Sequence, residues 1–284
     1  MDQLIAYFSH IPSSHRSAIL FGGIAFFWLI ETILPLLHMQ YNKWRHAGVN
    51  LFYTGTTIVV NFLLAFLLAI TASWSETHRV GLLFFLPTIP VWAYALLGLL
   101  GLDLIGAYLT HWIEHQIPVL WRFHLIHHSD KWVDTTTANR HHPGESILRF
   151  VFTCLGILAV GAPMWLVLLY QTCSVVATQF NHANIKLPSR FDYLLSYLLV
   201  SPNMHKVHHH YKLPYTDSNY GNIFALWDRL FGTFSYLPVE QLVYGIDTYT
   251  DDQQTNSITA LWKIPFARDF RFKQPNACPK SVIK

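Results

Sequence analysis

The chain has 284 residues, of which 52 % are hydrophobic and only 12 % charged, about half the charged fraction of an average soluble protein. Its net charge of +3 is too small and too scattered to indicate binding to nucleic acid. The three cysteines, Cys154, Cys173 and Cys278, show no CxxC spacing, which excludes a zinc finger, a cysteine-ligated iron–sulfur cluster and a disulfide framework. This composition, rich in Trp and Tyr, is typical of a membrane protein.

Three apolar tracts in the first 110 residues predict membrane-spanning helices. Residues 18–37 and residues 51–74 are each long enough for a hydrocarbon core of about 30 Å. The third tract covers residues 81–108, and the prolines near its start place the span from about Val91 onwards. Residues 38–50 carry basic but no acidic side chains, so the positive-inside rule predicts a cytoplasmic loop. The N-terminus lacks the features of a signal peptide, and we expect it to be uncleaved.

Histidines dominate the second half of the chain, where twelve of the seventeen lie between His111 and His210. They form one HxxxH box at residues 111–115 and two HxxHH boxes at residues 124–128 and 205–209. Residues three and four apart share one face of a helix, and neutral imidazole is a common metal ligand. A single HxxxH pair is more commonly an ordinary surface or core pair. Three boxes in one apolar chain predict a metal site, placed on the cytoplasmic side because box one follows the third span.

A fourth apolar tract, residues 147–180, separates the second box from the third. If all boxes build one site they lie on one side of the membrane, so this tract is predicted to be a helical hairpin turning at Gly161-Ala162-Pro163. We therefore expect an all-α membrane helical bundle of about four spans, arranged as two hairpins and capped by a cytoplasmic histidine-rich helical domain. The expected regions are a transmembrane region at residues 1–110, a histidine-box catalytic region at 111–235 and a soluble tail at 236–284.

The donor set restricts the metal and the reaction. Histidine-rich sites without thiolates suit Zn, Cu, Fe or Ni, and eight or more imidazoles exceed what one ion needs. Few carboxylates lie near the boxes, the nearest being Glu114, Asp130 and Glu145. Two other interpretations remain. A membrane zinc hydrolase would use Glu114 or Glu145 as general base. A non-enzymatic metal transporter would place its ligands at mid-membrane on broken helices.

The motifs from residue 100 to residue 235 resemble one known family, the fatty acid hydroxylase/sterol desaturase superfamily. The resemblance is carried, in order, by Asp103 and Tyr108 ahead of His111-xxx-His115, by Trp121-Arg122-Phe123-His124-xx-His127-His128-Ser129, by His142-Pro143-x-Glu145, by Phe180-Asn181-His182-Ala183-Asn184, by His205-xx-His208-His209, by Asn219-Tyr220-Gly221-Asn222 and by Trp227-Asp228-xx-Phe231-Gly232-Thr233. The first hundred residues are similar to the family only in their apolar character.

The resemblance implies which residues bind metal. The implied ligands are His111, His115, His124, His127, His128, His182, His205, His208 and His209. His142, Glu145 and Asp103 are further candidates, either as ligands or as residues that contact a ligand from outside. For Asp103, about two helical turns before His111, two roles stay open: a partner for a histidine on another helix, or a structural polar contact. His141 and His210 are left out of the ligand set.

The resemblance also implies a function. It predicts a membrane-bound non-haem di-iron oxygenase that uses O2 to hydroxylate or desaturate a lipid, either sterol-like or fatty-acyl/sphingolipid. Two iron ions would be the cofactors. The chain has no GxGxxG loop, so electrons are expected from an external donor similar to cytochrome b5 or ferredoxin. The basic loop with Lys43 and Arg45 is a candidate docking site for an acidic donor.

Overall fold

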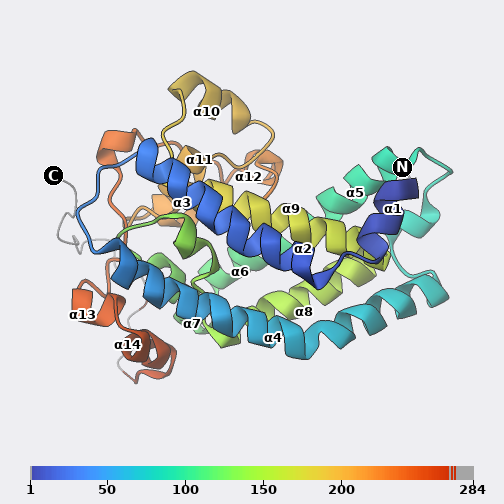
Figure 1. Ribbon diagram of the computed structural model, residues 1–284, viewed down its shortest axis with the longest axis horizontal. Helices are drawn as coiled ribbons and strands as arrows, with labels where there is room; N and C mark the ends of the chain where they lie inside the picture. The colour runs from blue at the N-terminus through green and yellow to red at the C-terminus, as the bar shows by residue number, and fades with distance from the viewer. Residues whose placement is uncertain (1, 269, 271, 273–284) are drawn as a thin grey trace.

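The protein is all-α, as predicted. The computed structural model describes residues 2–268, 270 and 272, and within them no β-strand forms, only three isolated bridges. Figure 1 shows the long helices lying side by side, with shorter helices gathered at one end. In chain order the elements are α1 (Asp2–Ser9), α2 (Ser13–Ser17), η1 (Ala18–Gly22), α3 (Gly23–Ile33), α4 (Lys43–His78), η2 (Leu82–Phe85), α5 (Val91–Asp103), η3 (Leu104–Leu109), α6 (Thr110–Gln116), α7 (Pro118–His128), η4 (Thr135–Asn139), α8 (Pro143–Val160), α9 (Met164–His182), α10 (Ser189–Leu195), α11 (Pro202–His208), η5 (Tyr215–Asp217), α12 (Leu226–Leu230), η6 (Val239–Gln241), α13 (Asp252–Thr255), α14 (Ile258–Lys263) and η7 (Ile264–Phe266).

Within the part of the chain that the structure describes, four helical stretches are long and apolar enough to cross a membrane, as in an integral membrane bundle. They are Ser13–Ile33, Lys43–Phe85, Val91–Gln116 and Pro143–Val160. Helix boundaries differ from the predicted tracts for local reasons. The first helix ends at Ile33, because Pro35 cannot continue it. The second begins eight residues early, where the Asn42 side chain caps the helix by accepting from the Arg45 N–H at 3.0 Å.

The predicted hairpin is formed by α8 and α9, which meet at Gly161. This glycine has φ +77°, a left-handed conformation that ends α8, and Pro163 precedes α9. A Cβ atom on Gly81 (φ +124°) would lie 2.1 Å from the Gly161 nitrogen, so the hairpin turn packs against the connection between α4 and α5. From Met164 to His182, α9 then rises about 27 Å. The turn therefore lies at the end of the bundle opposite the histidines.

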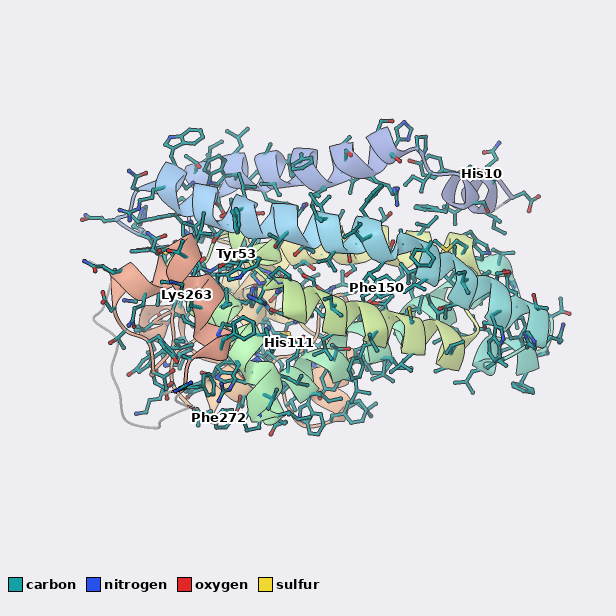
Figure 2. The ribbon with its side chains drawn as sticks, turned by 90° about the horizontal axis from the view of Figure 1, so that it is seen from below. His10, Tyr53, His111, Phe150, Lys263 and Phe272 are labelled. Carbon is teal, nitrogen blue, oxygen red and sulfur yellow. The ribbon has the colours of Figure 1, made fainter. Side chains whose placement is uncertain are left out.

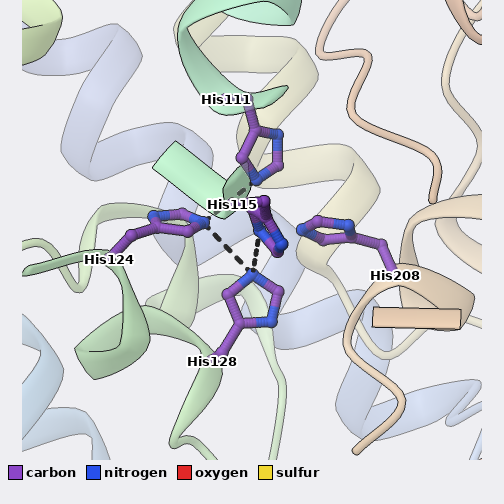
Figure 3. A group of neighbouring side chains, drawn as sticks. All are labelled: His111, His115, His124, His128 and His208. Carbon is purple, nitrogen blue, oxygen red and sulfur yellow. Dashed lines mark hydrogen bonds between the residues drawn. The ribbon is translucent and has the colours of Figure 1, made fainter. Parts of the chain in front are cut away.

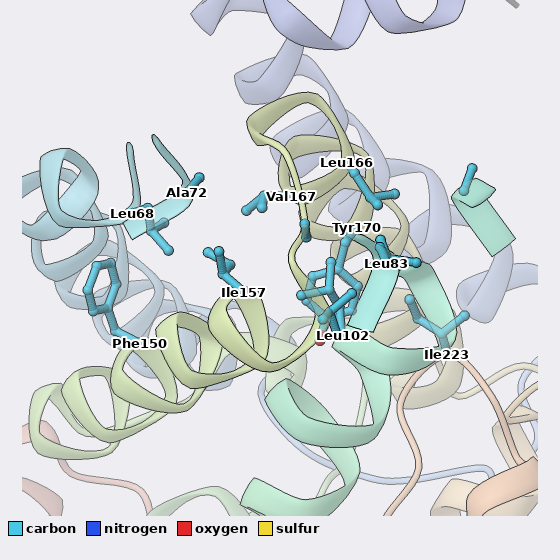
Figure 4. Close-up of a cluster of buried hydrophobic side chains, with 13 residues drawn as sticks. Leu68, Ala72, Leu83, Leu102, Phe150, Ile157, Leu166, Val167, Tyr170 and Ile223 are labelled. Atoms are coloured by element: carbon cyan, nitrogen blue, oxygen red, sulfur yellow. The ribbon is translucent and has the colours of Figure 1, made fainter. Parts of the chain in front are cut away.

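Helices α4, α5, α8 and α9 share one apolar core. Its buried cluster includes Leu68 of α4, Leu102 of α5, Ile157 of α8 and Leu166 and Tyr170 of α9, and Figure 4 shows it. Burying an aliphatic side chain of this kind stabilises a fold by roughly 1.5–3 kcal/mol in water. Within a bilayer the same contacts act mainly through close packing. This core fixes α9, and with it His182, relative to α5 and α8.

The C-terminal residues pack back onto the histidine-bearing helices. Leu261 and Ile264 contact Trp121 and Leu125 of α7 in a buried cluster, and the Tyr53 hydroxyl donates to the Ile258 carbonyl at 3.0 Å. Figure 2 shows Lys263 at the same end of the bundle as Tyr53 and far from His10. The predicted soluble tail thus lies against α7 as far as the structure describes it. Residues 269, 271 and 273–284 lie outside the described residues.

Candidate metal centre

Five histidines from three segments face one centre. His111 and His115 come from α6, His124 and His128 from α7, and His208 from α11, with one ring nitrogen of each within 4.8 Å of the others. Figure 3 shows their rings converging. The Nε2 atoms of His111 and His124 lie 3.1 Å apart, as do those of His115 and His128. We call these five residues group one.

Four more histidines form a second centre beside the first. His127 from α7, His182 at the end of α9, and His205 and His209 from α11 and its C-cap also bring one nitrogen each within 4.8 Å of the others. The Nε2 atom of His182 lies 3.0 Å from that of His127 and 3.1 Å from that of His205. We call these residues group two. The two groups touch where His128 stacks on His209, with ring centroids 4.7 Å apart.

Backbone carbonyls and carboxylates fix the tautomer of the group-one imidazoles. The His111 Nδ1 donates to the Tyr220 carbonyl at 2.9 Å, and the His208 Nδ1 donates to the Ser218 carbonyl at 2.6 Å. The His124 Nδ1 lies 2.8 Å from a Glu145 oxygen. Since carbonyl and carboxylate oxygens only accept, each Nδ1 carries the proton and each Nε2 presents its lone pair. The His115 Nδ1 faces Asp217 at 3.0 Å in the same way.

The lone pairs therefore point at one another, which fits a bound cation. In the pair formed by His111 and His124, both Nε2 atoms are acceptors, and acceptors 3.1 Å apart repel unless a positive charge lies between them. A metal ion supplies that charge, and outer hydrogen bonds of this kind commonly hold metal-ligating histidines in place. The residues of both groups fit nitrogen-bound transition metal.

Burial keeps the imidazoles neutral. All nine side chains are buried, with at most 6 % of their surface exposed, so water has little access to the nitrogens. Burial lowers the pKa of His124 to about 4, against an opposing effect of Glu145. Burial also holds the pKa of His127, His128, His205 and His209 well below the usual imidazole value. The nitrogens are thus available as ligands at neutral pH.

The two groups differ in their outer hydrogen bonds. In group two, the His182 Nδ1 lies 2.8 Å from the Thr178 carbonyl. The Nδ1 atoms of His127, His205 and His209 are buried and have no hydrogen-bond partner among the described residues. Outer hydrogen bonds therefore hold most of the histidines in group one, whereas in group two they hold mainly His182.

Residues 95–233 match the family model described as fatty acid hydroxylase, and this range contains all nine histidines of the two groups. The chain belongs to the fatty acid hydroxylase/sterol desaturase superfamily. It shares 28 % identity over 194 residues with the ornithine lipid hydroxylase OlsE of Rhizobium tropici, covering 68 % of this chain and 57 % of that protein.

Two further relatives align with a smaller share of this chain. Human alkylglycerol monooxygenase is 28 % identical over 176 residues, 60 % of this chain and 36 % of that protein. A cholesterol 25-hydroxylase-like protein of Danio rerio is 26 % identical over 132 residues, 45 % of this chain and 51 % of that protein. The matches thus span between about a third and just over half of these relatives. No solved structure matches the chain.

Of the three further candidates, Glu145 contacts a histidine of group one. Its Oε1 atom accepts from His124, from the Arg149 Nε at 3.0 Å and lies 2.8 Å from the His141 Nδ1. Arg149 also binds Glu114 at 2.5 Å. In this family member, Glu145 therefore orients His124, and Arg149 balances the charge of two buried carboxylates. His141, left out of the ligand set, stacks on His127 with centroids 4.8 Å apart.

Asp103 does not contact a histidine, and the expectation of a histidine partner is corrected. Its carboxylate accepts from the N–H groups of Ile223 and Phe224 at 3.2 Å and from the Trp227 indole at 3.1 Å. The physical reason is that the buried carboxylate at the end of α5 meets these three N–H donors of residues 223–227, so Asp103 makes the structural polar contact that the sequence had left open as its second role.

His142 and His210 lie outside both groups. The His142 Nδ1 accepts from the Gly144 N–H at 3.0 Å and caps α8, while its ring packs against Phe123 and Trp262. The His210 Nδ1 accepts from the Val243 N–H at 3.1 Å. The structure thus places His142 as a helix cap.

The roles of two residues that position the site, Asp228 and Lys206, were not predicted from the sequence. Asp228 accepts from the N–H groups of Tyr220 and Gly221, which holds the carbonyl that orients His111. Lys206 is fully buried, and its ammonium donates to the carbonyls of Asn181, His182 and Ala183. The only sequence signals were the Asp of the Trp227-Asp228 motif and a lysine inside box three.

A cavity of about 680 Å³ connects the two groups with the membrane helices. It reaches His111 and His182 at one end and extends between α4, α8 and α9 to Met164 and to residues of α2 and η1. Its wall includes Phe21, Ile58 and Phe62, which are also exposed on the lipid-facing surface. The cavity thus joins exposed apolar side chains of the candidate membrane spans to the histidines.

Proposed function

We propose that this protein is an iron-dependent oxygenase that hydroxylates a membrane lipid, using O2 and electrons from an external donor. The names of its relatives, a lipid hydroxylase and monooxygenases, support hydroxylation over desaturation. One observation carries the proposal: nine buried imidazoles in two adjoining groups, beside a cavity open to lipid. Five and four nitrogens suit two ions, and iron, when bound, supplies the redox chemistry that O2 activation requires.

The chain's own residues perform the other tasks. The carbonyls of Tyr220 and Ser218, with Glu145 and Asp217, orient the ligand nitrogens. Burial excludes bulk water from the reacting end of the cavity. The cavity positions a lipid carbon next to groups one and two. We assign these tasks to residues 111–235, with the region before them anchoring the bundle in the membrane.

The histidines are proposed to face the cytoplasm, where an electron donor would dock. The predicted basic loop is in fact the first turn of α4: Lys43 lies 3.6 Å from Glu31 and sits over the Trp28 ring, whereas Arg45 is exposed. Arg45 is therefore the better contact for an acidic donor. Arg45→Glu should slow donor-dependent O2 uptake severalfold at low salt and leave the iron content unchanged. Unchanged uptake would contradict this docking site.

The experiment that tests the function is metal analysis of detergent-purified protein after anaerobic reconstitution with ferrous iron. The wild type is compared with His127→Ala and His208→Ala, each of which removes one ligand from a different group. We expect close to two irons per wild-type chain, a loss in each variant, and lipid-dependent O2 uptake only with iron bound. Two zinc ions with no uptake of iron would favour the hydrolase. A wild-type protein that retains no metal would overturn the proposal.

A further inference from the structure

One wall of the cavity is polar along a line that starts at the metal centre. Tyr170, Ser174, Thr178 and His182 occur at i+4 spacing on α9, and all four line the cavity. Residues at this spacing form a stripe on one helix face. We call the first three residues the polar track. Twelve residues separate Tyr170 from His182, which corresponds to about 18 Å along the helix.

The side chain of Asn222 hydrogen-bonds two residues of the polar track. Its carbonyl oxygen accepts from the Thr178 hydroxyl at 2.8 Å, and its amide donates to the Ser174 hydroxyl at 2.7 Å. Ser174 in turn hydrogen-bonds Tyr170. The hydroxyl groups of the track are thus held in place beside the cavity. Asn222 lies two residues after Tyr220, whose carbonyl orients His111. The same loop therefore positions both a histidine of group one and the polar track.

Next to the track lies an amide that the protein itself does not satisfy. Gln171 lines the same cavity and has no hydrogen-bond partner among the described residues. Polar side chains at membrane depth are costly, face the protein interior and mark the paths of substrates. On α8, Thr153 also lines the cavity, and its hydroxyl donates to the Arg149 carbonyl, which leaves its oxygen lone pairs facing inward. A plain hydrocarbon chain would leave these groups unpaired.

We infer that the cavity takes an amphipathic lipid whose hydrogen-bonding linkage lies on the polar track, on the stretch of α9 between Tyr170 and His182. The inference rests on the proposed function, since it names the substrate class of the same site. The linkage is an ester, ether, amide or hydroxyl group within about 18 Å of the metal end. The oxidised carbon then lies no more than about 18 Å from this linkage.

Binding in nanodiscs tests the inference without turnover. The probe is a photoreactive analogue of 1-O-hexadecylglycerol, and its cross-linking to the cavity is measured by peptide mass spectrometry. Competition by 1-O-hexadecylglycerol, which carries an ether and two hydroxyl groups, is compared with competition by hexadecane. We expect the alkylglycerol to compete about tenfold better or more in the wild type, as one or two hydrogen bonds would give.

Variants of cavity residues test which side chains cause the preference for the alkylglycerol over hexadecane. Gln171→Leu and the isosteric Thr178→Val should each reduce the preference toward equality, while Val176→Thr, on the exposed face of α9, should leave it unchanged. Equal competition by hexadecane in the wild type, or an undiminished preference in both cavity variants, would overturn the inference. Iron content is measured on the same samples, so a misfolded variant is recognised. Iron with no preference defeats this inference alone, whereas a preference with no iron defeats the proposed oxygenase.

Discussion

The Nδ1 atom of His124 lies 2.8 Å from Oε1 of Glu145, the carboxylate in the first turn of α8, which lies beside the histidine-bearing helix α7. This contact ties the hairpin of the membrane region to group one. Because the same oxygen also accepts from Arg149, the carboxylate stays ionised and directs the His124 proton away from the centre.

Glu145→Gln should therefore weaken metal binding. A glutamine amide can turn its NH2 group toward His124, which removes the fixed tautomer, and outer partners of this kind are worth about 10- to 100-fold in metal affinity. Competition with a chelator of known affinity, read by metal analysis, measures the change. Glu240→Gln, outside the site in η6, is the matched control. An affinity within twofold of the wild type would contradict the role of Glu145.

Metal removal should proceed in two phases. Group one is braced by Tyr220, Ser218, Glu145 and Asp217, whereas group two has its outer bond mainly at His182. The ion of group two should leave first when a chelator is titrated into the protein. His127→Ala should abolish the early phase, and His208→Ala should remove the late one. Release of both ions in one step from the wild type would show that the groups do not differ in this way.

Gly81→Ala should destabilise the bundle without touching the histidines. The added Cβ would lie 2.1 Å from the Gly161 nitrogen, and φ +124° is unfavourable for alanine. We expect a loss of about 1–3 kcal/mol, seen as a lower Tm in detergent. Gly55→Ala in α4, where a Cβ meets no atom within 4 Å, is the control and should be neutral or slightly stabilising. Equal Tm values for both variants would exclude the close packing of the two turns.

Titration of Asp228 should make the free energy of unfolding depend on pH, with a sign that follows from the shift of its pKa. Burial raises its pKa to about 6, although hydrogen bonds from Thr233, Gly221 and Tyr220 oppose the shift. Since the folded state takes up this proton at a higher pH than the unfolded state, the Asp228 contribution to the free energy of unfolding increases as the pH falls through 6. The Tm of the wild type minus that of Asp228→Asn should therefore grow between pH 7 and pH 5. A difference that stays constant or shrinks would contradict the assignment.

The histidines that come together in the structure could be predicted from the sequence more fully than their surroundings, and the reason is physical. The nine histidines carry their chemistry in the residue type, and their spacing indicates helices, so His111 and His208 could be named as candidates without knowing which group each joins. The division into two groups depends on how α7 crosses α9 and α11. The outer partners at Tyr220 and Ser218 are backbone carbonyls, which any residue provides and no motif marks.

Asp103 shows a second limit. Its two possible roles could not be distinguished from the sequence, because the N–H groups of Ile223 and Phe224 that it binds lie 120 and 121 residues away along the chain. The membrane hairpin, in contrast, could be predicted from Gly161 and Pro163 together with the requirement that all boxes lie on one side. Long-range requirements of this kind constrain topology better than they constrain the direction of a single side chain.

Group two takes His127 from α7, His182 from α9 and His205 and His209 from the region of α11. No contiguous piece of the chain holds this centre. During synthesis, α8 and α9 have to fold back on each other before box three can meet His127. The four histidines of group two therefore come together late in synthesis, and a chain truncated before residue 205 lacks two of them.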